Sequence, residues 1–158
     1  MRKEFAKHIL AHMKYNDKIW VIVGDLGYGI WDEVRHIVPD RFINVGAAEQ
    51  AMVDIGIGLA LEGKIPIIYT IAPFLLYRPF ESIRTYINHE QIPVKLVASG
   101  RDKEYAHDGI SHWSHDAKEI LHIFPHISTY FPHDTSEIES ITSKIIVSNK
   151  PDFVSLKR

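Results

Sequence analysis

Residues 41–70 read RFINVGAAEQAMVDIGIGLALEGKIPIIYT and contain one complete β–α–β unit. Residues 41–45 form a short apolar run with β-branched side chains, which predicts a buried strand. Residues 47–61 carry apolar side chains at helical spacing, and Gly63 is placed to end that helix. Residues 65–70 form the next apolar run. A strand, a helix and a strand in this order indicate parallel strands joined by a helix.

The same alternation continues toward both ends of the chain. Further strands are expected at residues 18–24, 93–99, 127–131 and 152–156. Helices are expected at residues 2–14, 31–38, 80–90, 117–124 and 135–148. About six strands alternating with helices imply an α/β fold, a three-layer structure whose mostly parallel sheet has helices on both faces. No repeat, low-complexity tract or linker interrupts this pattern, so residues 1–158 are expected to form one domain.

The composition excludes several classes of protein. Of the 158 residues, 46% are hydrophobic and 24% are charged, which is typical of a globular domain. The absence of cysteine excludes a disulfide framework, a thiolate nucleophile and any cysteine-ligated metal. A formal net charge of −2 gives no basic excess for nucleic acid. The charged N-terminus is unlike a signal peptide and no apolar run reaches about 18 residues, so we expect no membrane association and a cytoplasmic location.

The segments that follow the predicted strands are the candidates for a ligand-binding site. In parallel sheets, ligands bind outside the carboxyl ends of the strands. Loops are expected there at residues 24–29, 71–77 and 100–115, together with a turn at residues 46–50. The functional site is therefore expected to be assembled from these four segments.

Two motifs in these segments favour ordinary structural roles. Residues 24–29 (GDLGYG) match neither the phosphate loop nor the dinucleotide fingerprint, so the glycines are interpreted as turn residues. A second group, His107, His112 and His115 with Asp108 and Asp116, contains the side chains of a two-histidine-carboxylate metal site. Their spacing is not one that places ligands on a single element. Loop histidines that hydrogen-bond to substrate or solvent are favoured over a metal site.

Glu49 has two interpretations. It lies in the first turn of the predicted helix, where an acidic side chain commonly complements the helix dipole. It is also surrounded by the small residues Ala47, Ala48 and Ala51, which would let another surface close over the carboxyl group. The domain has no spare segment to cover Glu49, so this surface is expected to belong to another chain. Burial would favour the protonated form and make Glu49 a proton donor. Spacing alone favours the first interpretation.

Residues 41–70 resemble the R-F-x-N-x-G-I-A-E-Q-x-M…G-L-A-x-x-G-x-x-P pattern of the transketolase family, in the domain that binds the aminopyrimidine ring of thiamine diphosphate. Four other segments resemble motifs of the family in the same order. These are residues 23–26 (VGDL, family A-D-L), 72–81 (APFLLYRPFE, family A-x-F-x-x-x-R-x-Y-[DE]), 108–112 (DGISH, family D-G-P-T-H) and 132–134 (PHD, family P-x-D). Five ordered motifs extend the resemblance over nearly the whole chain.

The resemblance implies that the chain contacts thiamine diphosphate through four residues. Glu49 would be catalytic: it would hydrogen-bond the pyrimidine ring nitrogen and promote the tautomer that removes the proton from the thiazolium carbon. Phe74 would lie against the face of the pyrimidine. Asp25 and Leu26 would lie at the edge of the cofactor.

The resemblance also implies how a sugar substrate is held. Asp108 and His112 would bind its hydroxyl groups, and His112 would be catalytic at the carbonyl oxygen. The serine that sugar-phosphate enzymes of the family carry near the D-L motif is replaced here within residues 27–29, while Arg2 resembles a phosphate-binding arginine. The resemblance therefore implies a small sugar or sugar-phosphate substrate and leaves its phosphorylation open.

Part of the family pattern is absent from this sequence. The family holds Mg²⁺ and the diphosphate through a GDG…N motif on another domain, and no GDG occurs here. The family's C-terminal domain is also missing. The chain is therefore expected to be the pyrimidine-binding subunit of a split transketolase-like enzyme, inactive alone, that forms a homodimer or a heteromer. A partner subunit would hold Mg²⁺ and the diphosphate. The alternatives are a non-catalytic regulatory or scaffold remnant and a small-molecule-binding domain unrelated to thiamine.

Overall fold

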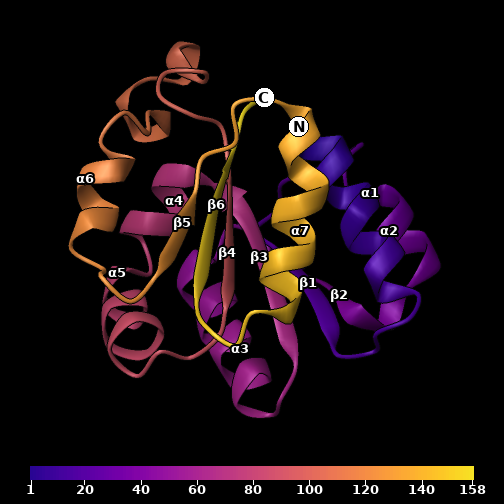
Figure 1. Ribbon diagram of the computed structural model, residues 1–158. Coiled ribbons are helices and arrows are strands. Elements are labelled where there is room, and N and C mark those ends of the chain that lie inside the picture. The colour runs from indigo at the N-terminus through magenta and orange to yellow at the C-terminus, as the bar shows by residue number, and fades with distance from the viewer.

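A six-stranded parallel sheet forms the centre of the molecule, in the order β2-β1-β3-β4-β6-β5 (Figure 1). The computed structural model describes residues 1–158. The α/β fold with one parallel sheet, predicted from the alternation of apolar runs, is confirmed. No helix in the structure is both long enough and apolar enough to cross a lipid bilayer.

The elements follow one another along the chain as strands alternating with helices. The strands are β1 (Ile19–Val23), β2 (Phe42–Asn44), β3 (Ile65–Ile71), β4 (Lys95–Ser99), β5 (Ser128–Tyr130) and β6 (Asp152–Leu156). The α-helices are α1 (Arg2–Met13), α2 (Asp32–Ile37), α3 (Glu49–Leu61), α4 (Ala72–Tyr77), α5 (Phe80–Ser82), α6 (Ala117–His122) and α7 (Ile138–Val147). The shorter helical segments are η1 (Pro39–Arg41), the π-helix η2 (Ile83–His89), η3 (Ala106–Asp108), η4 (Ile110–His112) and η5 (Thr135–Glu137).

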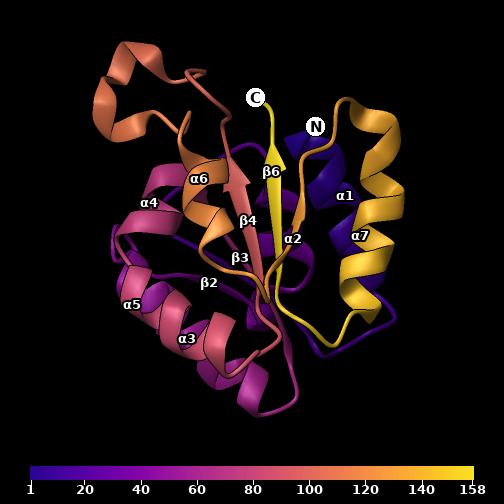
Figure 2. The same cartoon turned by 60° about the vertical axis from the view of Figure 1, so that its left-hand side comes forward.

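Helices cover both faces of the sheet and create two hydrophobic cores (Figure 2). On one face, α3, α4, η2 and α6 pack buried side chains such as Met52, Leu75 and Leu121 against the sheet. On the other face, α1, α2 and α7 contribute residues such as Phe5 and Ile145. The central strands are buried on both faces, which explains why their sequences are continuously apolar.

The chain changes face between β1 and β3. The connection after β1 leads to α2 on one face, whereas the connection after β3 leads to α4 on the other. The two strands are neighbours, with Val23 paired to Tyr69. Adjacent strands whose connections diverge leave a crevice at their carboxyl ends, which is where open α/β sheets bind ligands.

Residues 71–77 were expected to form a loop, and this expectation is wrong. They form α4, with Pro73 in its first turn and the side chains of Leu75 and Leu76 in the core. Proline is compatible with the first turn of a helix, where its missing N–H has no intrahelical partner. The helix expected at residues 80–90 is also different, because α5 passes directly into the π-helix η2.

The segment between β4 and α6 projects above the sheet (Figure 1). An isolated antiparallel bridge between Asp102 and Ser114 closes it at its base, where the Ser114 N–H donates to the Asp102 carbonyl over 2.8 Å. Two short 3-10 turns, η3 and η4, lie inside the closed segment. This segment, expected to be a polar loop over residues 100–115, is a compact loop held at both ends.

Candidate active site

Glu49 is the first residue of α3, and its side chain is 2% exposed. The Arg78 guanidinium donates to Glu49 Oε2 over 2.7 Å from the C-terminal end of α4. The Arg78 side chain is 45% exposed, so a half-exposed cation neutralises a buried acid. The other carboxylate oxygen, Glu49 Oε1, accepts no hydrogen bond from the chain.

Glu49 Oε1 lies near Gly24, beside the ends of β1 and β3. A Cβ atom built on Gly24 would be 3.4 Å from Met52 Sδ, 3.5 Å from Thr70 Oγ1 and 3.6 Å from Glu49 Oε1, so a thioether and two oxygens approach this glycine. Thr70 is fully buried, and its hydroxyl has no hydrogen-bond partner. A buried hydroxyl without a partner costs free energy. Because Thr70 Oγ1 is enclosed, Glu49 Oε1 is the oxygen here that is suited to a ligand with polar edge atoms.

Phe74 and His112 extend this arrangement toward the surface. The Arg78 guanidinium carbon lies 3.7 Å from the centre of the Phe74 ring, and the His112 ring meets the same ring edge-on with 4.9 Å between centres. Phe74 and Arg78 are four residues apart, which places them on the same side of the helical segment. Glu49, Arg78, Phe74 and His112 therefore form a continuous set of contacts that joins three separate segments of the chain.

Asp25 follows Gly24 in the turn after β1. Its φ angle is 51°, in the left-handed region. The Tyr28 hydroxyl donates to Asp25 Oδ1 over 2.5 Å, and the Asp25 N–H donates to Asn44 Oδ1 over 3.0 Å. The hydrogen bond from Tyr28, followed by that from Asn44, lowers the pKa of Asp25, so it stays ionised. Leu26, the next residue, is half-buried against the core on the α1 side.

Asp108 lies in the projecting loop and is exposed. Its carboxylate is 3.2 Å from His107 Nε2, while His112 Nδ1 is hydrogen-bonded to the Ser111 hydroxyl over 3.0 Å. The structure therefore places Asp108 and His112 in the same loop, and of the two only His112 contacts Phe74. No three His, Asp or Glu side chains of the chain converge as metal ligands.

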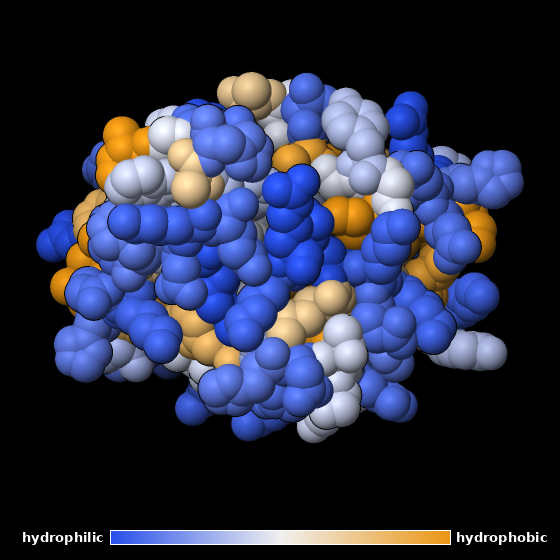
Figure 3. Space-filling view, turned by 90° about the horizontal axis from the view of Figure 1, so that it is seen from above, coloured by the Kyte–Doolittle hydropathy of each residue, from blue (hydrophilic) through white to orange (hydrophobic).

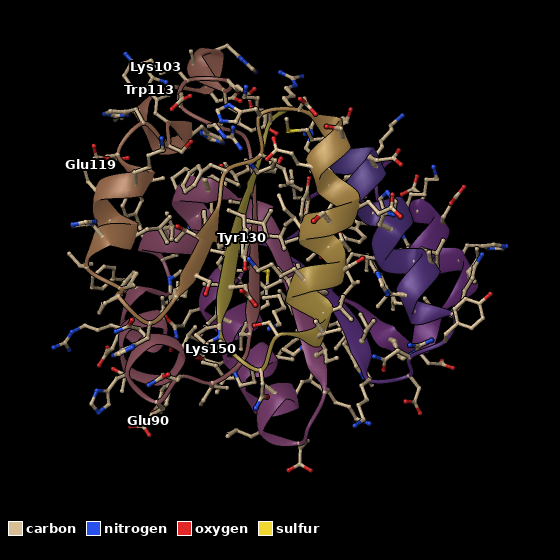
Figure 4. The ribbon with its side chains drawn as sticks, in the orientation of Figure 1. Glu90, Lys103, Trp113, Glu119, Tyr130 and Lys150 are labelled. Carbon is tan, nitrogen blue, oxygen red and sulfur yellow. The ribbon has the colours of Figure 1, made fainter.

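A cation–aromatic contact adjoins the bridge at the base of this loop. The Lys103 ammonium lies 4.4 Å from the centre of the Trp113 ring, and both residues lie above the sheet (Figure 4). From above, the end of the molecule that carries the strand termini is covered mainly by hydrophilic side chains, with small separate hydrophobic areas (Figure 3). This end of the molecule is therefore mainly polar at its surface.

Arg2 contacts the root of the loop. Its guanidinium donates to Ser99 Oγ over 3.3 Å and to the Tyr105 hydroxyl over 3.0 Å. The neighbouring Tyr69 hydroxyl is enclosed, and burial raises its pKa to about 12. In this structure Arg2 is thus engaged in fixing the loop between β4 and α6.

One expectation about Glu49 is corrected by these contacts. The sequence predicted that a second chain is needed to remove the carboxyl group from solvent. The chain buries Glu49 by itself, because the side chain turns inward toward Gly24 and pairs with Arg78. Ala47, Ala48 and Ala51, expected to surround the acid, are exposed instead.

Three contacting residues were not singled out from the sequence. Arg78 lies within a quoted motif, but no role was inferred for it. Its position four residues after Phe74 would have indicated a shared helical face once α4 was recognised. Thr70 ends an apolar run and looks like an ordinary strand residue. Asn44 links the loops after β1 and β2 through contacts that no local pattern predicts.

Comparison of the sequence with known proteins identifies relatives of the chain. The sequence matches the family described as "Transketolase, pyrimidine binding domain" over residues 1–158. It is 27% identical over 159 residues to a "Putative transketolase C-terminal section" of Methanocaldococcus jannaschii, covering 100% of this chain and 50% of that protein. It is 31% identical over 118 residues to one subunit of the apulose-4-phosphate transketolase of Actinobacillus succinogenes, covering 75% of this chain and 38% of that protein.

Solved structures agree with the sequence comparison. A protein described as "Split gene transketolase, inactive beta4 tetramer" superposes with a TM-score of 0.88 at 28% identity, over 99% of this chain and 51% of that one. Transketolase from Leishmania mexicana has the same fold, with a TM-score of 0.86 at 21% identity over 99% of this chain and 25% of that one. The chain spans about half the length of the curated relatives it matches.

Proposed function

The chain belongs to the family of transketolase pyrimidine-binding domains, and from this premise we propose that it is the pyrimidine-binding subunit of a split transketolase-like enzyme. Transketolases are transferases that depend on thiamine diphosphate. The reaction proposed is transfer of a two-carbon ketol unit, or a related acyl unit, between sugar-like substrates. The observation that carries this proposal is the buried carboxylate of Glu49, held through Oε2 and unpaired at Oε1.

The residues of the site fit the pyrimidine ring. An aminopyrimidine has polar atoms on its edge and an apolar face, and the chain offers the unpaired Glu49 Oε1 together with the Phe74 ring, both of which Arg78 contacts. Glu49 Oε1 is proposed to share a proton with the ring nitrogen. Phe74 is proposed to lie against the ring, and Asp25 with Leu26 at the cofactor's edge.

When bound, thiamine diphosphate supplies the acidic carbon that attacks a carbonyl and carries the ketol unit. The chain's own residues are proposed to bind and orient the cofactor ring and the substrate. Glu49 presents Oε1 in a place from which most solvent is excluded. His112 and Asp108 are proposed to hydrogen-bond the hydroxyl groups and carbonyl oxygen of the substrate from the loop above the sheet, with His112 taking part in proton transfer.

Mg²⁺ and the diphosphate are assigned to a partner subunit in this proposal. The chain has no GDG…N motif and no convergent set of metal ligands. Charged contacts to the diphosphate and Mg²⁺ would supply most of the affinity for the cofactor. Two relatives are named as subunits of transketolases, for apulose 4-phosphate and for 6-deoxy-6-sulfo-D-fructose, which supports a divided enzyme and a sugar-like substrate here.

Two measurements test the proposal. Calorimetry of the purified chain with Mg²⁺ and thiamine diphosphate is expected to give weak binding at best, and the chain alone is expected to be inactive. Co-expression with a GDG…N-bearing chain from the same genome is expected to give a complex that binds the cofactor and transfers ketol units. Submicromolar binding by the isolated chain would contradict the split site. A complex that binds the cofactor without turnover would instead support a regulatory or scaffold role.

A further inference from the structure

We propose that Arg78 is a positioning residue that fixes Glu49 and Phe74 relative to each other, so that one guanidinium sets the geometry of both the acid and the aromatic ring. This inference rests on the proposed function for the roles of Glu49 and Phe74. The contacts themselves belong to the chain alone. Arg78 directly follows α4, and Glu49 is the first residue of α3, which packs on the same face of the sheet.

The contact with Glu49 occupies Oε2 and leaves Oε1 available to a ligand. A carboxylate rotates readily about its last bond, because that torsion has broad minima. The 2.7 Å bond from Arg78 Nη1 to Oε2 holds the group in one orientation, with Oε1 toward the position of Gly24. Arg78 is also the only cation in an ion pair with this buried acid, and an unpaired buried charge is strongly disfavoured.

The contact with Phe74 orients the ring. The guanidinium carbon lies 3.7 Å from the ring centre, a distance at which a planar cation stacks on an aromatic face. His112 approaches the edge of the same ring, with an angle of 66° between the two planes. Phe74 is therefore contacted by Arg78 on its face and by His112 at its edge. Because Arg78 also binds Glu49, its position fixes Phe74 and Glu49 relative to each other.

Two substitutions of Arg78 separate its two contacts. Methionine keeps an unbranched side chain but removes the charge, so both contacts are lost. Lysine retains a cation for Glu49 but has no planar group to stack on Phe74. The matched control is Arg84→Met, since Arg84 is exposed on η2 and makes no ion pair or aromatic contact.

The first experiment uses the isolated chain and requires neither cofactor nor partner. In NMR spectra with ¹³C-labelled phenylalanine and histidine, R78M is expected to move the ring signals of Phe74 and His112 by more than a linewidth. R84M is expected to leave them in place. Unchanged Phe74 and His112 signals in a folded R78M protein would overturn the inference, whatever the outcome for the function.

The second experiment uses the chain assembled with its GDG…N-bearing partner. R78M is expected to lower turnover and to raise the cofactor concentration for half-saturation, each by about 10- to 100-fold, the factor for losing a hydrogen bond to a charged group. R78K is expected to restore turnover to within about threefold of wild type, while most of the defect in half-saturation remains. Equal loss of both parameters in R78K would contradict the separation of the two contacts.

A double-mutant cycle distinguishes a positioning role from a structural one. If Arg78 acts on turnover through Glu49, adding R78M to E49Q lowers turnover no further. The same loss in both backgrounds would show that Arg78 acts independently of Glu49 and would overturn the inference. Full activity of E49Q itself would instead contradict the proposed function, and the NMR result would still decide whether Arg78 positions the ring.

Discussion

At the scale of single residues, Glu49 combines burial, an ion pair on one oxygen and an unpaired second oxygen. Glu49→Gln keeps the shape of the side chain and removes the group that exchanges a proton. Turnover of the assembled enzyme is expected to fall by at least about 10²-fold, the usual contribution of general acid–base catalysis. Steady-state kinetics measure the loss, and light scattering checks that the complex still forms. Wild-type turnover in E49Q would show that Glu49 has only a structural role at the start of α3.

Gly100 is a second position where one residue decides local geometry. Its φ angle is 82°, and a Cβ there would overlap the Tyr105 ring. Gly100→Ala is therefore expected to displace Tyr105 and weaken its hydrogen bond with Arg2. The control is Gly63→Ala, since Gly63 has a φ of 73° with nothing near its Cβ position.

Chemical denaturation compares the two alanine variants. G63A carries only the penalty of a left-handed backbone, about 1–2 kcal/mol. G100A adds a steric clash and is expected to be destabilised by about 1–3 kcal/mol more. Equal unfolding free energies for the two variants would show that the loop moves aside without cost.

At the scale of elements, a buried ion pair joins β4, β6 and the end of α7. Lys95 Nζ lies 2.8 Å from Asp152 Oδ2 and also donates to the carbonyls of Ser148 and Lys150. Burial lowers the pKa of Lys95, an effect that Asp152 opposes. Lys95→Met leaves a buried carboxylate without its cation and is expected to cost about 3–5 kcal/mol of unfolding free energy.

Urea denaturation checks the Lys95 prediction, with Lys3→Met as the exposed control on α1. The double variant K95M/D152L replaces both charges with apolar groups. It is expected to be more stable than K95M, because no isolated charge remains buried. A K95M protein as stable as K3M would show that the ion pair contributes nothing to the fold.

Asp134 caps η5, the short helix that leads into α7, and its contribution to the stability of the fold depends on pH. Asp134 Oδ1 accepts from the Ser136 hydroxyl and N–H, and these bonds lower the pKa of Asp134 below its ordinary value of 3.8. A lowered carboxyl pKa stabilises the fold above the ordinary value, and this contribution is lost as the pH falls through the lowered value. Asp134→Ala is thus expected to be less stable than wild type at neutral pH, with the difference shrinking in strong acid. Urea midpoints across the pH range measure it, and a constant difference would contradict it.

At the scale of the whole molecule, the proposed site requires a second chain for Mg²⁺ and the diphosphate. Ala47, Ala48 and Ala51 are exposed beside Glu49 and small enough for close approach by another surface. Ala51→Arg is expected to break the assembly and leave the fold intact, since the position is outside the core. The control is Ala11→Arg on the exposed side of α1. Light scattering of each variant with the partner measures the effect, and an intact complex of A51R would place the interface elsewhere.

The sequence by itself determined the order of the elements and the class of fold. Strands buried on both faces must be continuously apolar, and helices that cover them must be apolar on one side, so β1, β3, β4 and β6 with their helices could be recognised from composition and period. The motif around Glu49 also indicated the family. The expected loop at residues 71–77 failed because proline suggests an interruption, whereas α4 tolerates Pro73 in its first turn.

Only the tertiary structure decided how the site is assembled. Glu49 and Arg78 are far apart in sequence, and their ion pair exists because α3 and α4 pack on the same face of the sheet and converge at its carboxyl edge. Likewise, the sequence assigned the covering of Glu49 to another chain, whereas the chain covers it from within. A local pattern reports which face of an element is buried, but not which distant side chain meets it there. That choice follows from the packing of the elements and the face change between β1 and β3.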